Sequence, residues 1–252
     1  MFDLSPYSPF ALSFLASCAL VAGLARGFSG FGAALIFIPL ASTVVSPTIA
    51  APVLLIVDLV MAAGLIPGAW RIANRREVGV MLIGTLAGVP AGTLILAHSD
   101  AIAIRWMIAV LVLCLLTLLM SGWRFKGRAG APLTTAIGAV AGLFSGIAQV
   151  GGPPIVVYWL SVESRPEIVR ANIVLYFAAS ASLTTVSYIV AGILTTGIVG
   201  LALVIGPAYG LGLFLGSHSF GLASPKTYTR ICYAMIAAAG IISLPILDGI
   251  IR

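Results

Sequence analysis

Ten apolar segments fill most of this sequence, and they limit its possible folds more than any other feature. Hydrophobic residues make up 61% of the chain and charged residues 8%, whereas soluble domains average about 45–50% apolar and about 25% charged. So few charges could not cover the surface of a water-soluble globule. The chain is therefore predicted to be an all-α integral membrane protein, with one membrane domain over residues 1–252.

The apolar segments form two halves of five, over residues 1–125 and 130–252. A transmembrane helix needs about 20 residues, and the second segment of each half is shorter. Each short segment is predicted to be a tilted span, a half-helix or a re-entrant arm. The predicted segments are 8–26, 30–45, 48–68, 78–98 and 101–121 in the first half, and 131–147, 151–162, 168–191, 195–216 and 227–247 in the second.

A glycine-rich break precedes the short segment of each half. The first reads Gly27-Phe28-Ser29-Gly30-Phe31-Gly32, and the second reads Phe144-Ser145-Gly146, then Gln149-Val150-Gly151-Gly152-Pro153-Pro154. Each glycine weakens a helix by about 1 kcal/mol relative to alanine. Breaks at matching positions of two hydrophobic halves are typical of transporters built from repeats around a central site. We align the halves on the two Phe-Ser-Gly triplets, which lie 116 positions apart.

A second repeated pattern is a pair of glycines four residues apart. Gly88-x3-Gly92 in the fourth segment matches Gly212-x3-Gly216 in the ninth, at an offset of 124. Small residues at this spacing let two helix backbones approach closely. These glycines are therefore predicted to pack helices together and are not included among the site residues.

Basic residues indicate the orientation of the chain. With five crossings per half and the N-terminus outside, eleven of the 13 Lys and Arg residues fall on the cytoplasmic side, as the positive-inside rule predicts. Because five is odd, the second half is then inverted and both termini are periplasmic. Four crossings per half, with the first glycine motif re-entrant and the halves parallel, is the alternative. The net charge of +6 is thus assigned to topology, and no nucleic-acid partner is expected.

The breaks also predict an anion site. Amide groups at the start of a helix have no helical acceptor and lie at the positive end of the helix dipole. The hydroxyls of Ser29 and Ser145 and the amide of Gln149 could add hydrogen bonds. The alternative is that the glycines only permit tight helix crossing. The candidate substrate-binding residues are Arg26, Phe28, Ser29, Gly30, Phe31, Gly32, Ser145, Gly146, Gln149, Gly151, Gly152, Pro153, Arg170 and Asn172.

Ionisable residues in apolar segments are candidates for function. Arg26 is either a direct anion ligand or an anchor at the cytoplasmic end of its segment. Asp58 lies inside the third segment and is either half of a structural ion pair or a possible proton or cation coupling residue. Arg170 either sets topology or lines a vestibule with Asn172. The sequence contains no motif of metal-ligating residues and no nucleophile beside a base, so neither a metal, a cofactor nor an enzyme is expected.

The two glycine motifs, with Pro39 and the basic loops near residue 70 and between the halves, resemble the sulfite exporter TauE/SafE family. The sequence differs from the family pattern at Ala33 and Ala34, where glycine is common. The resemblance implies a bacterial inner-membrane permease that exports a small sulfur-containing anion, sulfite or an organosulfonate such as sulfoacetate, by alternating access. The alternatives are a proton-coupled importer of thiosulfate or sulfonate and a non-transporting membrane subunit. The oligomeric state is left open.

Overall fold

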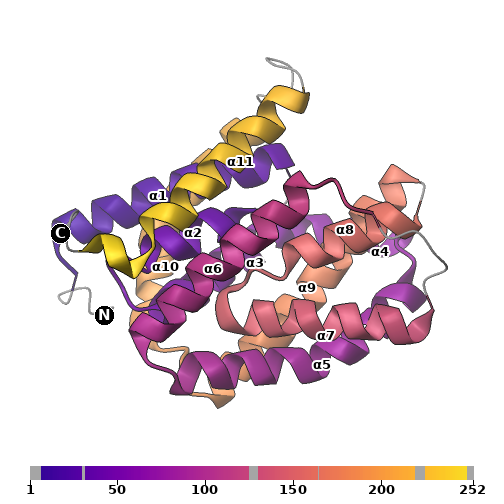
Figure 1. Ribbon diagram of the computed structural model, residues 1–252, viewed down its shortest axis with the longest axis horizontal. Helices are drawn as coiled ribbons and strands as arrows, with labels where there is room; N and C mark the ends of the chain where they lie inside the picture. Colours follow the sequence, from indigo (N-terminus) through magenta and orange to yellow (C-terminus); the bar gives the residue numbers. More distant parts are fainter. Residues whose placement is uncertain (1–6, 30–31, 125–129, 164, 219–224, 249–252) are drawn as a thin grey trace. The chain divides into compact units, whose positions relative to one another are not determined.

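The computed structural model describes residues 7–29, 32–124, 130–163, 165–218 and 225–248, and these ranges are helical without any strand (Figure 1). The helices are α1 (Pro9–Ser29), α2 (Ala33–Ala41), α3 (Pro47–Ala62), the 3-10 helix η1 (Ala63–Leu65), α4 (Ile66–Ile72), α5 (Arg75–His98), α6 (Ala101–Met120), α7 (Ala131–Ala148), α8 (Gly152–Val162), α9 (Pro166–Val190), α10 (Thr196–His218), α11 (Pro225–Ile242) and the 3-10 helix η3 (Pro245–Leu247).

Seven helical segments in the described ranges are long and apolar enough to cross a membrane. They are α1, the run from α3 to α4, α5, α6, α7, α9 and α10. The protein is therefore an all-α integral membrane protein, as the composition predicts. The two short segments are helices of 9 residues (α2) and 11 residues (α8). At 1.5 Å per residue, each is about half as long as the roughly 30 Å hydrocarbon core, which favours the half-helix prediction.

The third predicted span, 48–68, is not one continuous α-helix. It begins as α3, passes through the 3-10 helix η1 and continues as α4 to Ile72. Pro67 stands at the start of α4, and its missing N–H cannot bond back to the preceding turn. Gly64 in the same turn weakens the helix further. A change of helix type at this point is the expected result.

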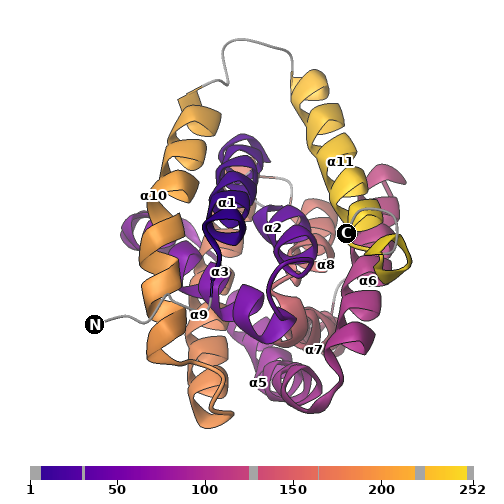
Figure 2. The same cartoon turned by 90° about the vertical axis from the view of Figure 1, so that its left-hand side faces the viewer.

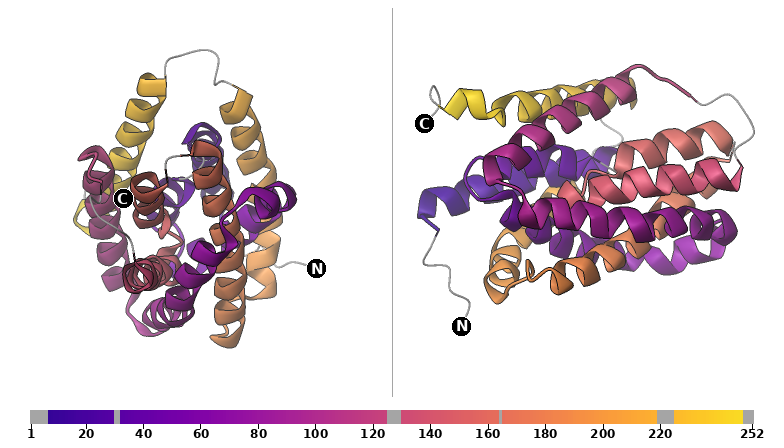
Figure 3. Two further views of the ribbon diagram at one scale, coloured as in Figure 1. Left: turned by 90° about the vertical axis from the view of Figure 1, so that its right-hand side faces the viewer. Right: turned by 60° about the horizontal axis from the view of Figure 1, so that its bottom comes forward.

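The chain packs into two compact units, and each unit combines helices from both halves of the sequence. Unit 1 contains residues 1–57, 99–117 and 194–252, and unit 2 contains residues 58–98 and 118–193. In unit 1 the main helix pair is α1 with α10 (Figure 2). In unit 2 it is α5 with α7, which run side by side (Figures 1 and 3). Each pair thus joins the first helix of one half to the fourth segment of the other.

Glycines bring the backbones of both pairs into direct contact. A Cβ at Gly88 of α5 would overlap the carbonyl oxygen of Ala139 on α7, and a Cβ at Gly212 of α10 would overlap that of Leu20 on α1. No side chain larger than hydrogen fits there without moving the helix. The prediction that the two Gly-x3-Gly sequences pack helices is confirmed.

The same contacts correct the alignment of the two halves. A Cβ at Gly27 would meet the carbonyl of Leu213, and a Cβ at Gly146 would meet that of Val89. The two partner carbonyls are 124 residues apart, the offset of the Gly-x3-Gly sequences, whereas the two glycines are 119 apart.

The ends of the helices follow the same offset of 119. Helices α1 and α7 end at Ser29 and Ala148, and α2 and α8 begin at Ala33 and Gly152. The Phe-Ser-Gly triplets, 116 apart, are therefore not equivalent. Ser145 therefore corresponds to Arg26 and not to Ser29. The equivalence of the two halves follows from which backbone each glycine contacts on the paired helix, and the similarity of the neighbouring residues does not determine it.

Candidate functional site

The break between α7 and α8 turns on Gln149, which has φ 59 and is the only non-glycine residue with positive φ in the described ranges. This left-handed conformation costs a residue with a Cβ about 1–2 kcal/mol. The backbone N–H of Gln149 donates to the carbonyl of Ser145 at 3.0 Å, and its side-chain Nε2 donates to the same carbonyl at 2.9 Å. The backbone N–H and the side-chain amide of Gln149 therefore both cap the C-terminus of α7.

Tyr188 of α9 supports this end of α7 from the side. Its ring is fully buried, and its hydroxyl donates to the carbonyl of Gly146 at 2.9 Å. Gln149 Nε2 also donates to the Tyr188 hydroxyl at 3.4 Å. The bend is thus held by a fully buried tyrosine and a half-buried glutamine.

Gly151 and Ser145 bring the two arms of the break together. A Cβ at Gly151 would overlap both the carbonyl oxygen of Ala141 and the hydroxyl oxygen of Ser145. Ser145 is buried, and its hydroxyl therefore lies directly beside the first backbone atoms of α8. The last turn of α7, with Ser145 and Gly146, and the start of α8, with Gly151 and Gly152, thus lie close together around Gln149, and their role as ligands stays a prediction.

The two short helices differ in the donors that they offer. Helix α8 begins Gly152-Pro153-Pro154, and the two prolines have no N–H, so few amides are free at its start. Helix α2 follows Gly32, which has φ 99 and provides no side-chain cap. Its first residues keep their N–H groups, so the start of α2 offers more amide donors than the start of α8. Anion binding at either break stays a prediction.

The remaining predicted residues of the first break belong to unit 1. Arg26 is half-buried in the last turn of α1, where a cation interacts favourably with the negative end of the helix dipole. Phe28 and Ser29 complete α1 as helical backbone. Gly30 and Phe31 lie outside the described residues. Their predicted roles as ligands stay predictions.

Arg170 and Asn172 of α9 do not share one environment, although they are two residues apart. Arg170 is exposed, and Asn172 is fully buried. The Asn172 Oδ1 accepts the backbone N–H of Asn74 at 2.7 Å, which ties the start of α5 to α9. Asp58 is half-buried in α3. Contact with substrate or coupling ion stays a prediction for these three residues.

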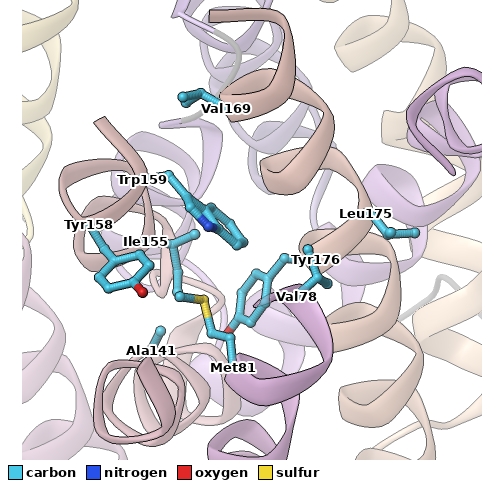
Figure 4. Close-up of a cluster of buried hydrophobic side chains, with 9 residues drawn as sticks. All are labelled: Val78, Met81, Ala141, Ile155, Tyr158, Trp159, Val169, Leu175 and Tyr176. Atoms are coloured by element: carbon cyan, nitrogen blue, oxygen red, sulfur yellow. The ribbon is translucent and has the colours of Figure 1, made fainter. Parts of the chain in front are cut away.

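A polar and aromatic cluster near the start of α5 was missed in the sequence. The Tyr158 hydroxyl lies 2.6 Å from Thr134 Oγ1 and donates to Glu77 Oε1 at 3.2 Å. Trp159, next to Tyr158, packs edge-on against Tyr176 of α9 (Figure 4). A signal was available, since Tyr158 and Trp159 are bulky residues with polar atoms inside a short apolar segment. Their partners, however, come from three other helices.

Comparison with known proteins assigns the family. Residues 15–242 match the sulfite exporter TauE/SafE family. The chain belongs to this family. A TauE/SafE protein of Cupriavidus necator, described as a probable sulfite/organosulfonate exporter TauE, is 25% identical over 218 residues, which cover 84% of this chain and 85% of that relative. No solved structure matches the chain.

Membership agrees with the described fold. A TauE/SafE protein is a membrane transporter, and the seven long apolar helices provide the multi-pass scaffold that a transporter requires. The irregular backbone at the break in α7–α8 is tolerated at membrane depth only where protein or a water-filled cavity surrounds it. In the described residues no group of three His, Cys, Asp or Glu side chains could hold a metal ion.

Proposed function

We propose that this TauE/SafE protein exports a small sulfur-containing anion, sulfite or an organosulfonate such as sulfoacetate, across the bacterial inner membrane by alternating access. The observation that carries this proposal is the start of α2. Gly32 has φ 99, no side chain caps the helix, and most of the nine residues of α2 are buried. Uncapped amides in such a place favour an anionic ligand.

The two breaks supply different chemistry in this proposal. At the first, Arg26 stands one residue before Gly27 and adds a full positive charge. At the corresponding place of the second break, Ser145 adds a neutral hydroxyl beside Gly151. The guanidinium of Arg26 in unit 1 and the hydroxyl of Ser145 in unit 2 are each a kind of group that binds an oxyanion. The C. necator relative, described as a sulfite/organosulfonate exporter, supports this substrate class.

Export needs no second ion. An anion that leaves an inside-negative cell gains about 2.3 kcal/mol per charge per 100 mV. The membrane potential therefore suffices to drive export of sulfite or a sulfonate.

The test is flux in proteoliposomes loaded in turn with sulfite, sulfoacetate, thiosulfate and sulfate, with and without an imposed potential. We expect efflux of sulfite or sulfoacetate that rises with potential. Ser145→Ala should raise KM by about tenfold, the loss of one hydrogen bond to a charged group. Ser182→Ala is the matched control, since Ser182 is exposed on α9 and bonds only within its own helix. Folded protein that moves none of the four anions would contradict the proposal.

A further inference from the structure

Glu77 is a half-buried carboxylate that contacts only neutral groups in the described part of the chain. It lies in the first turn of α5. Its Oε1 accepts the Tyr158 hydroxyl at 3.2 Å, and its Oε2 accepts the Asn74 side-chain amide at 3.5 Å. Neither partner carries a charge. A carboxylate without a cationic partner at the edge of a buried cluster is a candidate for binding a proton.

A second polar group of this cluster is a buried donor. The indole N–H of Trp159, the residue next to Tyr158, has no hydrogen-bond partner in the described residues. Trp159 is fully buried, and its ring lies between Tyr158 and Tyr176 (Figure 4). A buried donor without a partner calls for an explanation. A carboxylate that changes its charge and position would supply one.

The charged groups around Glu77 come from its own helix and from α8 and α9. On α5, Arg75 lies over the Trp70 ring, 5.4 Å from its centroid. At the end of α8, Glu163 Oε1 lies 3.6 Å from Arg165 Nε. The other Arg and Glu side chains on α5 and α9 are exposed, and they are Arg76, Glu167 and Arg170; Arg71 at the end of α4 is exposed too.

The hydroxyls beside Glu77 have two complete arrangements of hydrogen bonds. With Glu77 ionised, Thr134 donates to Tyr158 and Tyr158 donates to the carboxylate. With Glu77 protonated, its own O–H donates to Tyr158 and Tyr158 donates to Thr134. The Thr134 hydroxyl then donates to the carbonyl of Gly130, which lies 3.2 Å away. Every hydroxyl keeps an acceptor in both states, so one proton can be gained or lost without leaving a donor unpaired.

Helix α8 connects this cluster to the break. It begins at Gly152, next to Gln149 and Ser145, and it carries Tyr158 and Trp159 near its other end. About two turns of α8 separate Gly152 from Tyr158, so the hydrogen-bonded backbone of one short helix links the cluster to the break.

We propose that Glu77 binds a proton, and that Tyr158 and α8 couple its protonation to anion binding at the α7–α8 break. This coupling rests on the proposed anion transport, while proton binding itself does not. The step is the addition of one proton to one carboxylate oxygen, with reversal of the Tyr158 and Thr134 hydroxyls.

Two measurements test proton binding by Glu77 and its coupling to anion transport separately. The first is infrared spectroscopy of the purified protein across a pH titration, which detects the carboxyl band of a protonated glutamic acid. The second is anion flux in proteoliposomes with and without a pH gradient. Glu77→Gln keeps an acceptor and the helix-start contacts but cannot titrate. Glu167→Gln is the matched control, because Glu167 is an exposed glutamate in the first turn of α9.

Subtraction of the Glu77→Gln spectrum from the wild-type spectrum isolates the Glu77 carboxyl band from those of the other six acidic residues. We expect this band to titrate, and to be present in Glu167→Gln. Flux in Glu77→Gln should no longer respond to the pH gradient. Tyr158→Phe should move the midpoint of the band to higher pH, since the ionised form loses a donor. A difference spectrum without a titrating band, or a band that does not move in Tyr158→Phe, overturns the proposal. A titrating Glu77 band in a protein that moves no sulfur anion would retain the proton site and refute the proposed function.

Discussion

Arg105 of α6 and Asp248 near the C-terminus form a bidentate ion pair. The Nη1–Oδ2 distance is 2.6 Å and the Nη2–Oδ1 distance is 2.9 Å. Arg105 is 8% exposed, and its Nη2 also donates to the carbonyl of Ser243 at 3.4 Å. In the predicted topology Arg105 is one of two basic residues outside the cytoplasmic side. Asp248 neutralises its charge, so a periplasmic Arg105 would be compatible with the predicted topology.

Removal of one partner of this pair should be costly. Asp248→Asn leaves the buried Arg105 charge uncompensated, and we expect a loss of about 3–5 kcal/mol in stability. Thermal unfolding in detergent measures it, with Asp100→Asn as the control because Asp100 is exposed and bonds only to the start of its own helix. A melting temperature equal to that of the control would show that the pair contributes nothing.

The contact between α5 and α7 should not tolerate a side chain at Gly88. Gly88→Ala places a methyl group on the backbone of Ala139, and we expect a loss of about 1–3 kcal/mol, the usual cost of overpacking. Gly79→Ala is the matched control on the same helix, since a Cβ at Gly79 meets nothing within 4 Å. Alanine there should be neutral or stabilising by up to about 1 kcal/mol. Equal unfolding temperatures for the two variants would refute the close contact.

Gln149 should respond to substitution in a definite order. Gln149→Gly loses the side-chain bonds to Ser145 and Tyr188 but removes the left-handed strain. Gln149→Ala loses the same bonds and keeps the strain. Alanine should therefore be less stable than glycine by about 1 kcal/mol. Chemical unfolding of both purified variants measures the difference, and the reverse order would show that φ at residue 149 is not positive.

Substitution of Gly32 by alanine should both strain the backbone and reduce transport. Gly32→Ala forces a Cβ into a left-handed conformation at the start of α2, and it should lower stability by about 1–2 kcal/mol. It should also reduce anion flux, because the amides of α2 would turn. Gly122→Ala imposes a similar strain at φ 60 in an exposed turn after α6, so it should lose stability but keep its flux per folded molecule. Full anion flux in Gly32→Ala would show that the amides at the start of α2 do not bind the substrate.

The sequence predicted the helices and their breaks well because those features depend on neighbours in the chain. Apolar run length sets where a helix can lie in a membrane, and glycine and proline act on their own turn. Thus the short helices α2 and α8 and the breaks before them can be predicted from the sequence, whereas the positive φ of Gln149 is seen only in the structure. The 3-10 turn η1 was also encoded locally, by Gly64 and Pro67, but hydropathy passes over it because both residues lie in an apolar run.

Composition, apolar run length and local motifs determined the class of this protein, its two repeated breaks and its family resemblance. The tertiary structure decided which residues are partners and that Arg26 and Ser145 hold matching positions in their helix pairs. The Glu77 to Tyr158 bond and the Arg105 to Asp248 pair both join residues far apart in the chain. A backbone contact at a glycine, or a hydrogen bond between distant side chains, depends on how helices pack. A local sequence pattern cannot predict these contacts, because they form between residues that are distant in the sequence.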